Sequence, residues 1–313
     1  MAGGNRRWAD ALVYVAVRVA VCVIQSVRIE TCIPAVRVTA WLLYHVLRIR
    51  RRVIDENLEK TFGNWSDRQR RLVALKMWEH LLLMVCEVAH APRKLHIFNF
   101  DRHIKFRDLP KMMRYLLDDR PVILVTGHFG NFELAGFASG LFGFPMFAIA
   151  RKLDNPFLDQ WIKQFRESGG QFLLDKNGCA RQVSTLLEHG ATLGLLGDQH
   201  AGDRGLWVDF LGRPASSHKA VAMFTLTSGA PQLVIYMRRT GKPMEFEMGI
   251  TDVADPAVGG PHLENAKSLT QWYNSQLGQV VMDWPDQYWW VHRRWRDQPV
   301  RKRAQPRETS KAA

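Results

Sequence analysis

The sequence VILVTGHFGNFELAG (residues 122–136) joins an apolar run to a helical pattern through a short polar segment. The apolar residues at its start predict a buried β-strand, and FELAG predicts the first turns of a helix. In open α/β sheets, ligand sites form at the carboxyl ends of strands. His128 and Glu133 follow the strand directly, so we expect a functional site at this point.

The same alternation of short apolar runs and helical patterns continues along the chain from residue 120. The predicted strands are PVILVT (121–126), FPMFAIA (144–150), ATLGLLG (191–197), PQLVIYMRR (231–239) and MEFEMGI (244–250). The predicted helices between and after them cover residues 131–142, 155–168, 179–190 and 263–282, and an earlier amphipathic helix covers 66–90 with Ser66 as its N-cap. This order predicts an α/β layered fold with a largely parallel sheet flanked by helices.

The N-terminal residues 1–52 are apolar but are interrupted by arginines. No charge-free run reaches the roughly 20 residues of a clean membrane span, and the arginines do not share one helical face; they are Arg18, Arg28, Arg37 and Arg48. We expect a membrane anchor of one or two helices, broken near Pro34. The cluster RIRRR (48–52) should mark its cytoplasmic end.

The net charge of +13 lies at the two ends of the chain. Residues 1–52 and 292–313 carry all of it, and the segment between them is balanced. Basic ends beside an apolar stretch suit an anionic membrane surface. Nucleic acid is the competing partner, but no nucleic-acid-binding pattern is visible and the middle of the chain is neutral, so we expect none. The four cysteines show neither disulfide nor zinc spacing, and no metal or cofactor is expected.

The pair His128 and Glu133 suits acid–base chemistry. A neutral imidazole is a competent general base near neutral pH, and a carboxylate on its other nitrogen would fix the tautomer. Backbone N–H groups of GHFGN at the start of a helix could stabilise an oxyanion. A capped turn with a satisfied histidine would show the same spacing, so the pattern alone leaves both readings open.

Three further motifs narrow the choice: NPFLDQWIKQFRESGG (155–170), GLLGDQHAGDRGLWVDFLGRPASSHKA (194–220) and PDQYWWVHRRWRDQP (285–299). Together with HFGNFE they resemble the bacterial lipid A biosynthesis acyltransferases, the lauroyl/myristoyl transferase family that includes mycobacterial phosphatidylinositol mannoside acyltransferases. The resemblance runs from about residue 50 to Pro299. The serine-nucleophile motif GxSxG is missing from the sequence, which fits acyl transfer without an enzyme nucleophile.

The resemblance implies roles for individual residues. His128 and Glu133 match the family's catalytic pair. Substrate-binding positions that position acceptor phosphate or stabilise developing charge fall on Arg166 and Asp198, with Arg151 and Asn155 around the NP motif. The motif departs from the family at His200, where a second acidic residue usually stands. The sequence leaves two assignments undecided. Arg293 and Arg294 either bind phosphate or a carrier protein, or are simply solvated. The segment LWVDFLGRP (206–214) either lines an acyl groove or belongs to the core.

The fold implied is the glycerolipid-acyltransferase α/β fold, with residues 53–298 as the acyltransferase domain and 299–313 as a basic disordered tail. The implied activity moves a fatty acyl chain from acyl carrier protein or coenzyme A to a hydroxyl of a glycolipid, with a lipid A precursor as first choice, at the cytoplasmic face of the cell inner membrane. Phosphatidylinositol mannoside or a lysophospholipid are alternative acceptors. A non-catalytic lipid-binding membrane protein is the alternative outside the enzymes.

Overall fold

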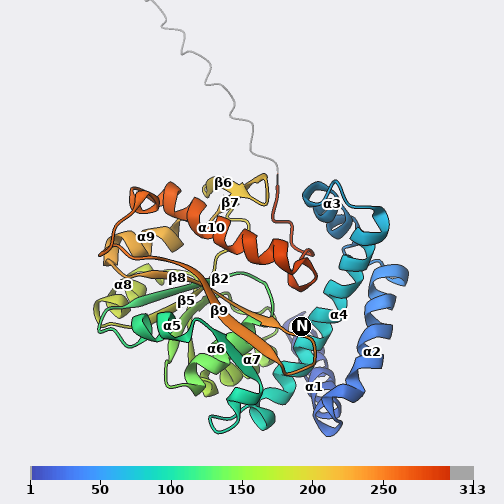
Figure 1. The fold of residues 1–313 in the computed structure, drawn as a ribbon. Coiled ribbons are helices and arrows are strands. Elements are labelled where there is room, and N and C mark those ends of the chain that lie inside the picture. Colours follow the sequence, from blue (N-terminus) through green and yellow to red (C-terminus); the bar gives the residue numbers. More distant parts are fainter. Residues whose placement is uncertain (1, 297–313) are drawn as a thin grey trace, which may run out of the picture.

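A seven-stranded sheet forms the centre of the computed structural model, which describes residues 2–296 (Figure 1). The strand order is β1-β9-β8-β2-β5-β3-β4, and only the β8–β9 pair is antiparallel. The strands are β1 (Ile104–Arg107), β2 (Val122–Thr126), β3 (Met146–Ala150), β4 (Gln171–Asp175), β5 (Thr192–Leu196), β8 (Gln232–Arg239) and β9 (Phe246–Ala254). The predicted α/β fold with a largely parallel sheet is confirmed. The predicted tail, residues 299–313, lies outside the described residues.

Helices cover both faces of this sheet. They are α5 (Leu109–Leu116), α6 (Phe132–Leu141), α7 (Pro156–Ser168), α8 (Ala180–Glu188), α9 (Lys219–Ser228) and α10 (Ala266–Asp283), with short 3-10 turns at Phe100–Arg102, Pro261–Leu263 and Pro285–Gln287. A two-stranded antiparallel hairpin, β6 (Leu206–Phe210) and β7 (Arg213–Ser217), packs against α10.

Two hydrophobic cores lie on opposite faces of the sheet, and strand β2 contributes to both. Val122 and Leu124 belong to the core beneath α2, α4 and α6, whereas Ile123 and Val125 belong to the core shared with α8 and α10. Side chains alternate between the faces of a strand. Because both faces are covered, the strand reads as an unbroken apolar run rather than an alternating one.

The N-terminal third is helical: α1 (Ala2–Ser26), α2 (Ile29–Trp41), a π-helical turn (Leu42–Val46), α3 (Arg51–Thr61) and α4 (Asp67–Lys94). The expected cap of α4 is confirmed, because the Ser66 hydroxyl accepts from the Gln69 backbone N–H in a capping box. Helix α2 buries Ile29, Cys32, Val36 and Ala40 in the core beside α4, so it is part of the folded body.

The expected helix break near Pro34 is wrong. Pro34 lies inside α2, and the chain turns instead between Ser26 and Ile29, where Arg28 has an extended backbone. A proline within the helix removes one backbone N–H donor, and the packing of α2 on α4 compensates for that loss.

Candidate active site

His128 and Asp198 meet because their strands are parallel neighbours in register. Thr126 at the end of β2 pairs with Leu196 at the end of β5, and each site residue follows two positions later. His128 Nδ1 lies 2.8 Å from Asp198 Oδ1, and the His128 backbone N–H donates to Asp198 Oδ2 at 2.8 Å. Asp198 is 1% exposed. Both oxygens of one buried carboxylate therefore fix the histidine.

The buried Asp198 is held as a carboxylate. Burial alone would raise its pKa. The attraction of His128 when it is protonated, together with the hydrogen bonds from its ring and its backbone N–H, outweighs burial and holds the pKa of Asp198 well below its ordinary value. A carboxylate can only accept, so His128 Nδ1 carries the hydrogen and Nε2 presents a lone pair. The Gln199 side-chain N–H donates to that Nε2 at 3.2 Å. The imidazole thus has the tautomer that a general base requires.

Glu133 does not hold His128, contrary to the expected dyad geometry. Its two oxygens accept from Arg166 in a bidentate pair, at 3.0 Å from Nε and 2.5 Å from Nη2. Both side chains are partly exposed. Glu133 sits in the first turn of α6 and faces Arg166 near the end of α7, so the spacing of five residues does not bring it to the imidazole. Asp198 and Arg166 therefore belong to two separate pairs, Asp198 with His128 and Arg166 with Glu133.

Arg151 follows the end of β3, and Asn155 is the N-cap of α7. Arg151 is highly exposed and pairs with Asp154 at 2.8 Å. The Asn155 carboxamide oxygen caps α7 by accepting from two backbone N–H groups, and its amide nitrogen donates to the Asp10 carbonyl of α1 at 2.8 Å. In this structure Asn155 joins α1 to the sheet domain.

An aromatic wall surrounds His128, and residue spacing did not predict it. The rings of Phe132, Trp289 and His292 lie 5.1, 5.0 and 4.8 Å from the imidazole. Burial first, and then the neighbouring His128, lower the pKa of His292 to about 4, so His292 is neutral near pH 7. The motif QYWWVHRRW carried the signal, since it places aromatic and imidazole groups close together in the chain. Beside this wall His128 is only 7% exposed.

The C-terminal segment also fastens the histidine loop through its backbone. The Trp289 N–H donates to the His128 carbonyl at 3.1 Å, and the Gly130 N–H donates to the Gln287 carbonyl at 2.9 Å. The Asn131 N–H donates to the Met237 carbonyl at 2.8 Å. The expected oxyanion role is therefore closed to the N–H groups of His128, Gly130 and Asn131, which already have acceptors.

Gly130 is required where the loop crosses β8. Its φ of +57° lies in the left-handed region, and a Cβ placed there would lie 1.9 Å from the Met237 carbonyl oxygen. A side chain would meet backbone that cannot move aside without disturbing the sheet. The close approach keeps His128 at the sheet edge.

A buried polar network supports the loop from below. Glu87 of α4 forms an ion pair with Arg239 of β8 at 2.6 Å, and Asn131 donates to Glu87 at 2.9 Å. His80 Nε2 lies 3.1 Å from the Gly130 carbonyl oxygen, and its Nδ1 lies 2.8 Å from Arg239 Nη1. Removing one partner of such a pair leaves a buried charge uncompensated, which is strongly destabilising. The network ties α4 to the histidine loop.

This network should make the folded state sensitive to mild acid. Burial, followed by the charge of Arg239, lowers the pKa of His80 to about 3, against 6.5 for an unperturbed histidine. Below about pH 6.5, His80 is protonated in the unfolded chain but stays neutral in the folded chain. The free energy of unfolding is therefore highest above about pH 6.5 and decreases as the pH falls below that value. We expect the Tm to fall between pH 7 and 5. A His80→Gln variant, whose amide can donate to Gly130 and accept from Arg239, should show a flatter profile. An identical slope in both proteins would contradict this role of His80.

Arg294, one of the two open arginines, is structural. It is 1% exposed, and its guanidinium donates to the Ser216 carbonyl, to the Ser217 hydroxyl and to Asn274 Oδ1 at 2.5, 2.6 and 3.0 Å. It joins the C-terminal segment to the β6–β7 hairpin and α10. Arg293 is exposed.

In residues 206–214, Val208 and Phe210 are core residues, whereas Trp207 and Arg213 face a cleft. Within residues 2–296, no three His, Cys, Asp or Glu side chains are grouped as a metal site requires.

Comparison with known proteins places this site in a family. The chain is 25% identical over 265 residues to the lipid A biosynthesis lauroyltransferase of Escherichia coli (strain K12), covering 82% of this chain and 83% of the relative. It is also 25% identical to the lipid A biosynthesis palmitoleoyltransferase of the same strain, covering 81% of each chain. The crystal structure of the 1-acyl-sn-glycerophosphate acyltransferase PlsC from Thermotoga maritima matches with a TM-score of 0.41 at 13% identity, covering 86% of this chain and all of that one.

A family model described as bacterial lipid A biosynthesis acyltransferase matches residues 5–297, nearly the whole length of the sequence. The match includes the histidine loop, the strand end that carries Asp198 and the C-terminal aromatic wall. The chain therefore belongs to the bacterial lipid A biosynthesis acyltransferase family and is an acyltransferase.

Proposed function

We propose that this enzyme transfers a fatty acyl chain from an acyl thioester to a hydroxyl of a lipid A precursor, with His128 as the general base and Asp198 as the residue that orients it. The observation that carries the proposal is the pair of Asp198 oxygens on His128 Nδ1 and its backbone N–H. These contacts keep the hydrogen on Nδ1, so Nε2, on the far side of the ring from the buried carboxylate, has a free lone pair. An acceptor hydroxyl is the group that such a lone pair activates.

In the proposed reaction, the acceptor hydroxyl approaches Nε2 at the position where the Gln199 amide now donates. Its proton passes to Nε2 as its oxygen bonds to the thioester carbonyl carbon. The C–S bond then breaks, and the leaving thiolate takes the proton from the imidazolium. Asp198 stabilises the imidazolium while it exists. Histidine is thus regenerated without a covalent acyl-enzyme.

Glu133 in the first turn of α6 and Arg166 near the end of α7 meet through their side chains. We infer that Glu133 holds the guanidinium in one orientation for the acceptor, as the bidentate pair suggests. We also propose that Arg151 and Asn155, which precede α7, contact the substrate.

A purified-protein assay tests the proposed function directly. Acyl-acyl carrier protein and acyl-coenzyme A are each offered with a lipid A precursor, a phosphatidylinositol mannoside or a lysophospholipid, and acylated products are measured by mass spectrometry. We expect transfer to the lipid A precursor in preference to the other acceptors. Preference for another acceptor would replace the proposed substrate. Failure of all combinations, with the lipids bound, would favour the non-catalytic lipid-binding alternative.

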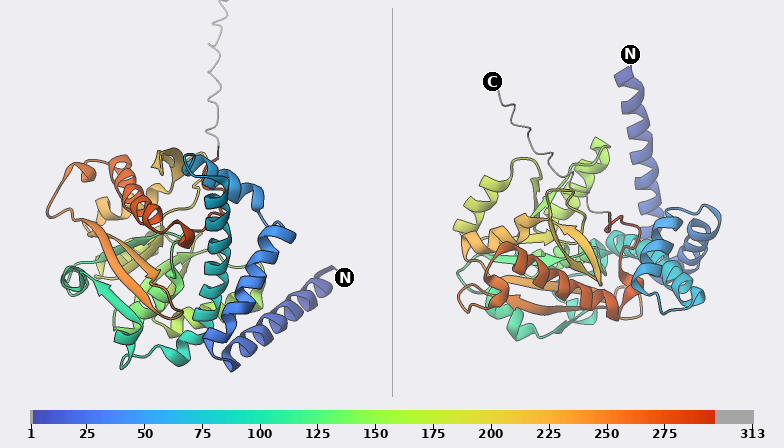
Figure 2. Two further views of the ribbon diagram at one scale, coloured as in Figure 1. Left: turned by 45° about the vertical axis from the view of Figure 1, so that its right-hand side comes forward. Right: turned by 90° about the horizontal axis from the view of Figure 1, so that it is seen from above.

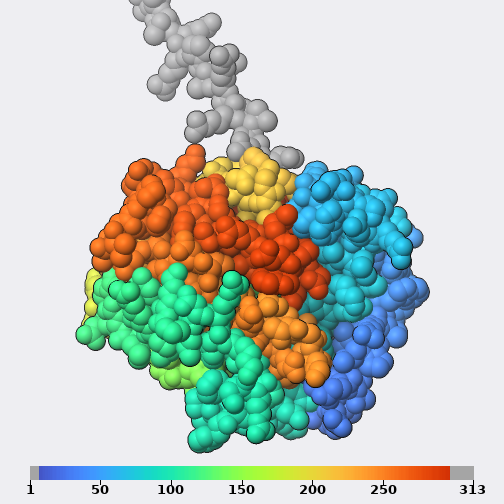
Figure 3. Space-filling model, viewed as in Figure 1, coloured from blue at the N-terminus to red at the C-terminus, as the bar shows by residue number. Residues whose placement is uncertain are grey.

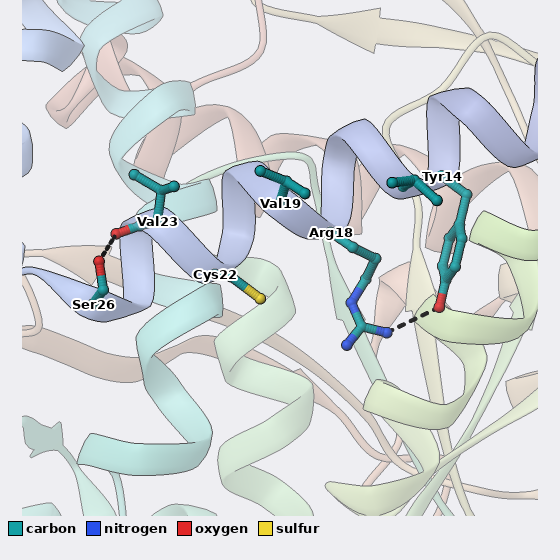
Figure 4. Close-up of a pocket in the computed structure, with 7 residues that line it drawn as sticks. Tyr14, Arg18, Val19, Cys22, Val23 and Ser26 are labelled. Atoms are coloured by element: carbon teal, nitrogen blue, oxygen red, sulfur yellow. Dashed lines mark hydrogen bonds between the residues drawn. The ribbon is translucent and has the colours of Figure 1, made fainter.

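Helix α1 is the proposed membrane contact. Residues Arg7–Ser26 are long and apolar enough to cross a membrane, and none of that segment is buried (Figure 2). Its exposed apolar side chains are Trp8, Leu12, Val13, Val15, Val19 and Val23. The one charged side chain in the middle of this segment, Arg18, has polar and aromatic partners. Its guanidinium donates to the Tyr14 hydroxyl at 2.9 Å and lies 5.3 Å from the Trp161 ring of α7. The hollow of about 490 Å³ along this helix is mainly apolar (Figure 4). We infer association with the cytoplasmic face of the inner membrane.

Removal of α1 separates the anchor from the folded body. Because α2 is part of the core, deletion of residues 1–26 is a cleaner change than a deletion that extends to residue 47. We expect the full chain to sediment with membranes after a carbonate wash. The shortened chain should appear in the supernatant and still unfold cooperatively, with a Tm lowered by the loss of contacts such as the hydrogen bond from Asn155 to the Asp10 carbonyl. Extraction of the full chain by carbonate would indicate surface attachment. Equal membrane retention of both proteins would contradict the assignment of α1.

A further inference from the structure

A second cleft of about 790 Å³ lies behind the active-site wall and is not used by the proposed reaction. Its walls come from α3, the β6–β7 hairpin and the C-terminal segment, which lie together at one end of the molecule (Figures 1 and 3). The residues that line it are Arg52, Val53, Glu56, Asn57, Lys60, Trp207, Arg213, Pro214, Arg293, Trp295 and Arg296.

The lining is strongly cationic. It contains five Lys or Arg side chains and one carboxylate, Glu56, which pairs with Lys60 at 2.5 Å. In the part of the chain that the structure describes, the other four cations have no ion pair; they are Arg52, Arg213, Arg293 and Arg296. Four uncompensated guanidinium groups around one concavity produce a positive potential that attracts anions.

Arg213 is the most informative of these groups. Its guanidinium lies 4.4 Å from the Trp295 ring, and its Nη1 is buried without a hydrogen-bond partner among residues 2–296. A buried donor without an acceptor carries the full cost of desolvation. A bound oxyanion would satisfy Nη1, because guanidinium groups match the geometry of phosphate oxygens.

The cleft shares a wall with the active site. His292 packs against His128, and the next residue, Arg293, lines the cleft. Asn57 on the cleft side donates to the carbonyls of Trp290 and His292, both at 2.9 Å. On the opposite wall, Trp207 lies 6.2 Å from His200, next to the Gln199 that donates to His128. One substrate molecule could therefore reach both sites.

We propose that this cleft binds a phosphoryl group carried by one of the two substrates, at a distance from the reacting atoms. The inference rests on the proposed function, since it assumes that acyl donor and acceptor react at His128. A recessed cleft with an indole and several guanidinium groups suits a phosphorylated sugar or a phosphorylated nucleotide. Both ligands present the same chemistry: phosphoryl oxygens beside a ring that packs on an aromatic side chain. The first would come from the acceptor glycolipid and the second from coenzyme A.

Binding of small soluble probes tests the site without turnover. Glucosamine 1-phosphate and coenzyme A are titrated by calorimetry into the full-length protein, with glucosamine and pantetheine as the matching probes without phosphate. The test variant is Arg52→Gln/Arg293→Gln, which removes two exposed cations of the cleft. The control variant is Arg114→Gln/Arg181→Gln, which removes two exposed cations on α5 and α8. We expect the affinity for a phosphorylated probe to fall at least about tenfold in the test variant alone.

Steady-state kinetics with the same variants then identify the source of the phosphoryl group. A KM raised for the acceptor, with kcat little changed, assigns the cleft to the glycolipid phosphate. A KM raised for coenzyme A thioesters assigns it to the donor. Equal probe affinity in the test variant, the control variant and the unmodified protein would overturn the proposal. Because binding is measured without acyl transfer, that result is distinct from a failure of the catalytic assay.

Discussion

Acyl transfer should fall by about 10²–10⁴-fold when His128 is replaced by alanine, the range expected for loss of a general base. Nε2 would no longer be available to take the acceptor proton. The loop itself should remain in place, since the His128 backbone N–H and carbonyl keep their bonds to Asp198 and Trp289. Initial rates with saturating acyl donor and lipid A precursor measure the effect.

A second variant, His128→Gln, distinguishes loss of the base from loss of stability. His128→Ala leaves the buried Asp198 carboxylate without its imidazole partner, which is destabilising. In His128→Gln the side-chain amide can still donate to Asp198 but is not a base. We expect both variants to lose activity and only His128→Ala to show a clearly lower Tm. Near wild-type transfer by His128→Gln would remove His128 from the role of base.

The fold was largely predictable from short-range patterns. The run PVILVT and the later apolar runs were recognisable as strands. Parallel strands that are covered on both faces appear in a sequence as short, unbroken apolar runs. Ser66 marks the start of α4 because a capping box is encoded within four residues. These signals depend on neighbours in the chain, so the sequence alone contains them.

The partner of His128 was not predictable in this way. Asp198 lies 70 residues from His128 and becomes its neighbour only because β5 inserts beside β2, between β2 and β3. Strand order depends on how the crossover helices pack, and the spacing of residues in the chain does not encode it. Glu133, which is near His128 in sequence, has both oxygens on Arg166. Short separation therefore favoured a carboxylate that contacts Arg166, whereas the carboxylate that contacts the imidazole is distant in the chain.

The aromatic wall shows the same limit. Trp289 and His292 reach His128 through backbone bonds between the C-terminal segment and the histidine loop. Their residue types were visible in the sequence, but nothing in the spacing placed them within contact of residue 128. The long-range contacts of the sheet edge thus decide the chemistry, although local patterns decide most of the elements.

The two carboxylates should differ sharply when each is replaced by its amide. In Asp198→Asn the amide N–H group can donate to His128 Nδ1, which moves the imidazole hydrogen to Nε2 and removes the lone pair that the reaction needs. We expect kcat to fall by about 10²–10⁴-fold, comparable to loss of the base. Glu133→Gln leaves both ring nitrogens of His128 with their present partners, so its effect should be smaller and should act through Arg166.

Parallel measurements of kcat and KM on the two variants distinguish the roles. If Asp198 orients the base and Glu133 orients Arg166, Asp198→Asn lowers kcat, whereas Glu133→Gln mainly raises the KM for the acceptor. Arg166→Gln should then resemble Glu133→Gln, and the double variant should be little worse than either single one, because both changes break the same bidentate pair. A drop in kcat with Glu133→Gln as large as that with Asp198→Asn would mean that Glu133 leaves Arg166 during the reaction. Glu133 would then act on His128 directly, as the motif spacing first predicted.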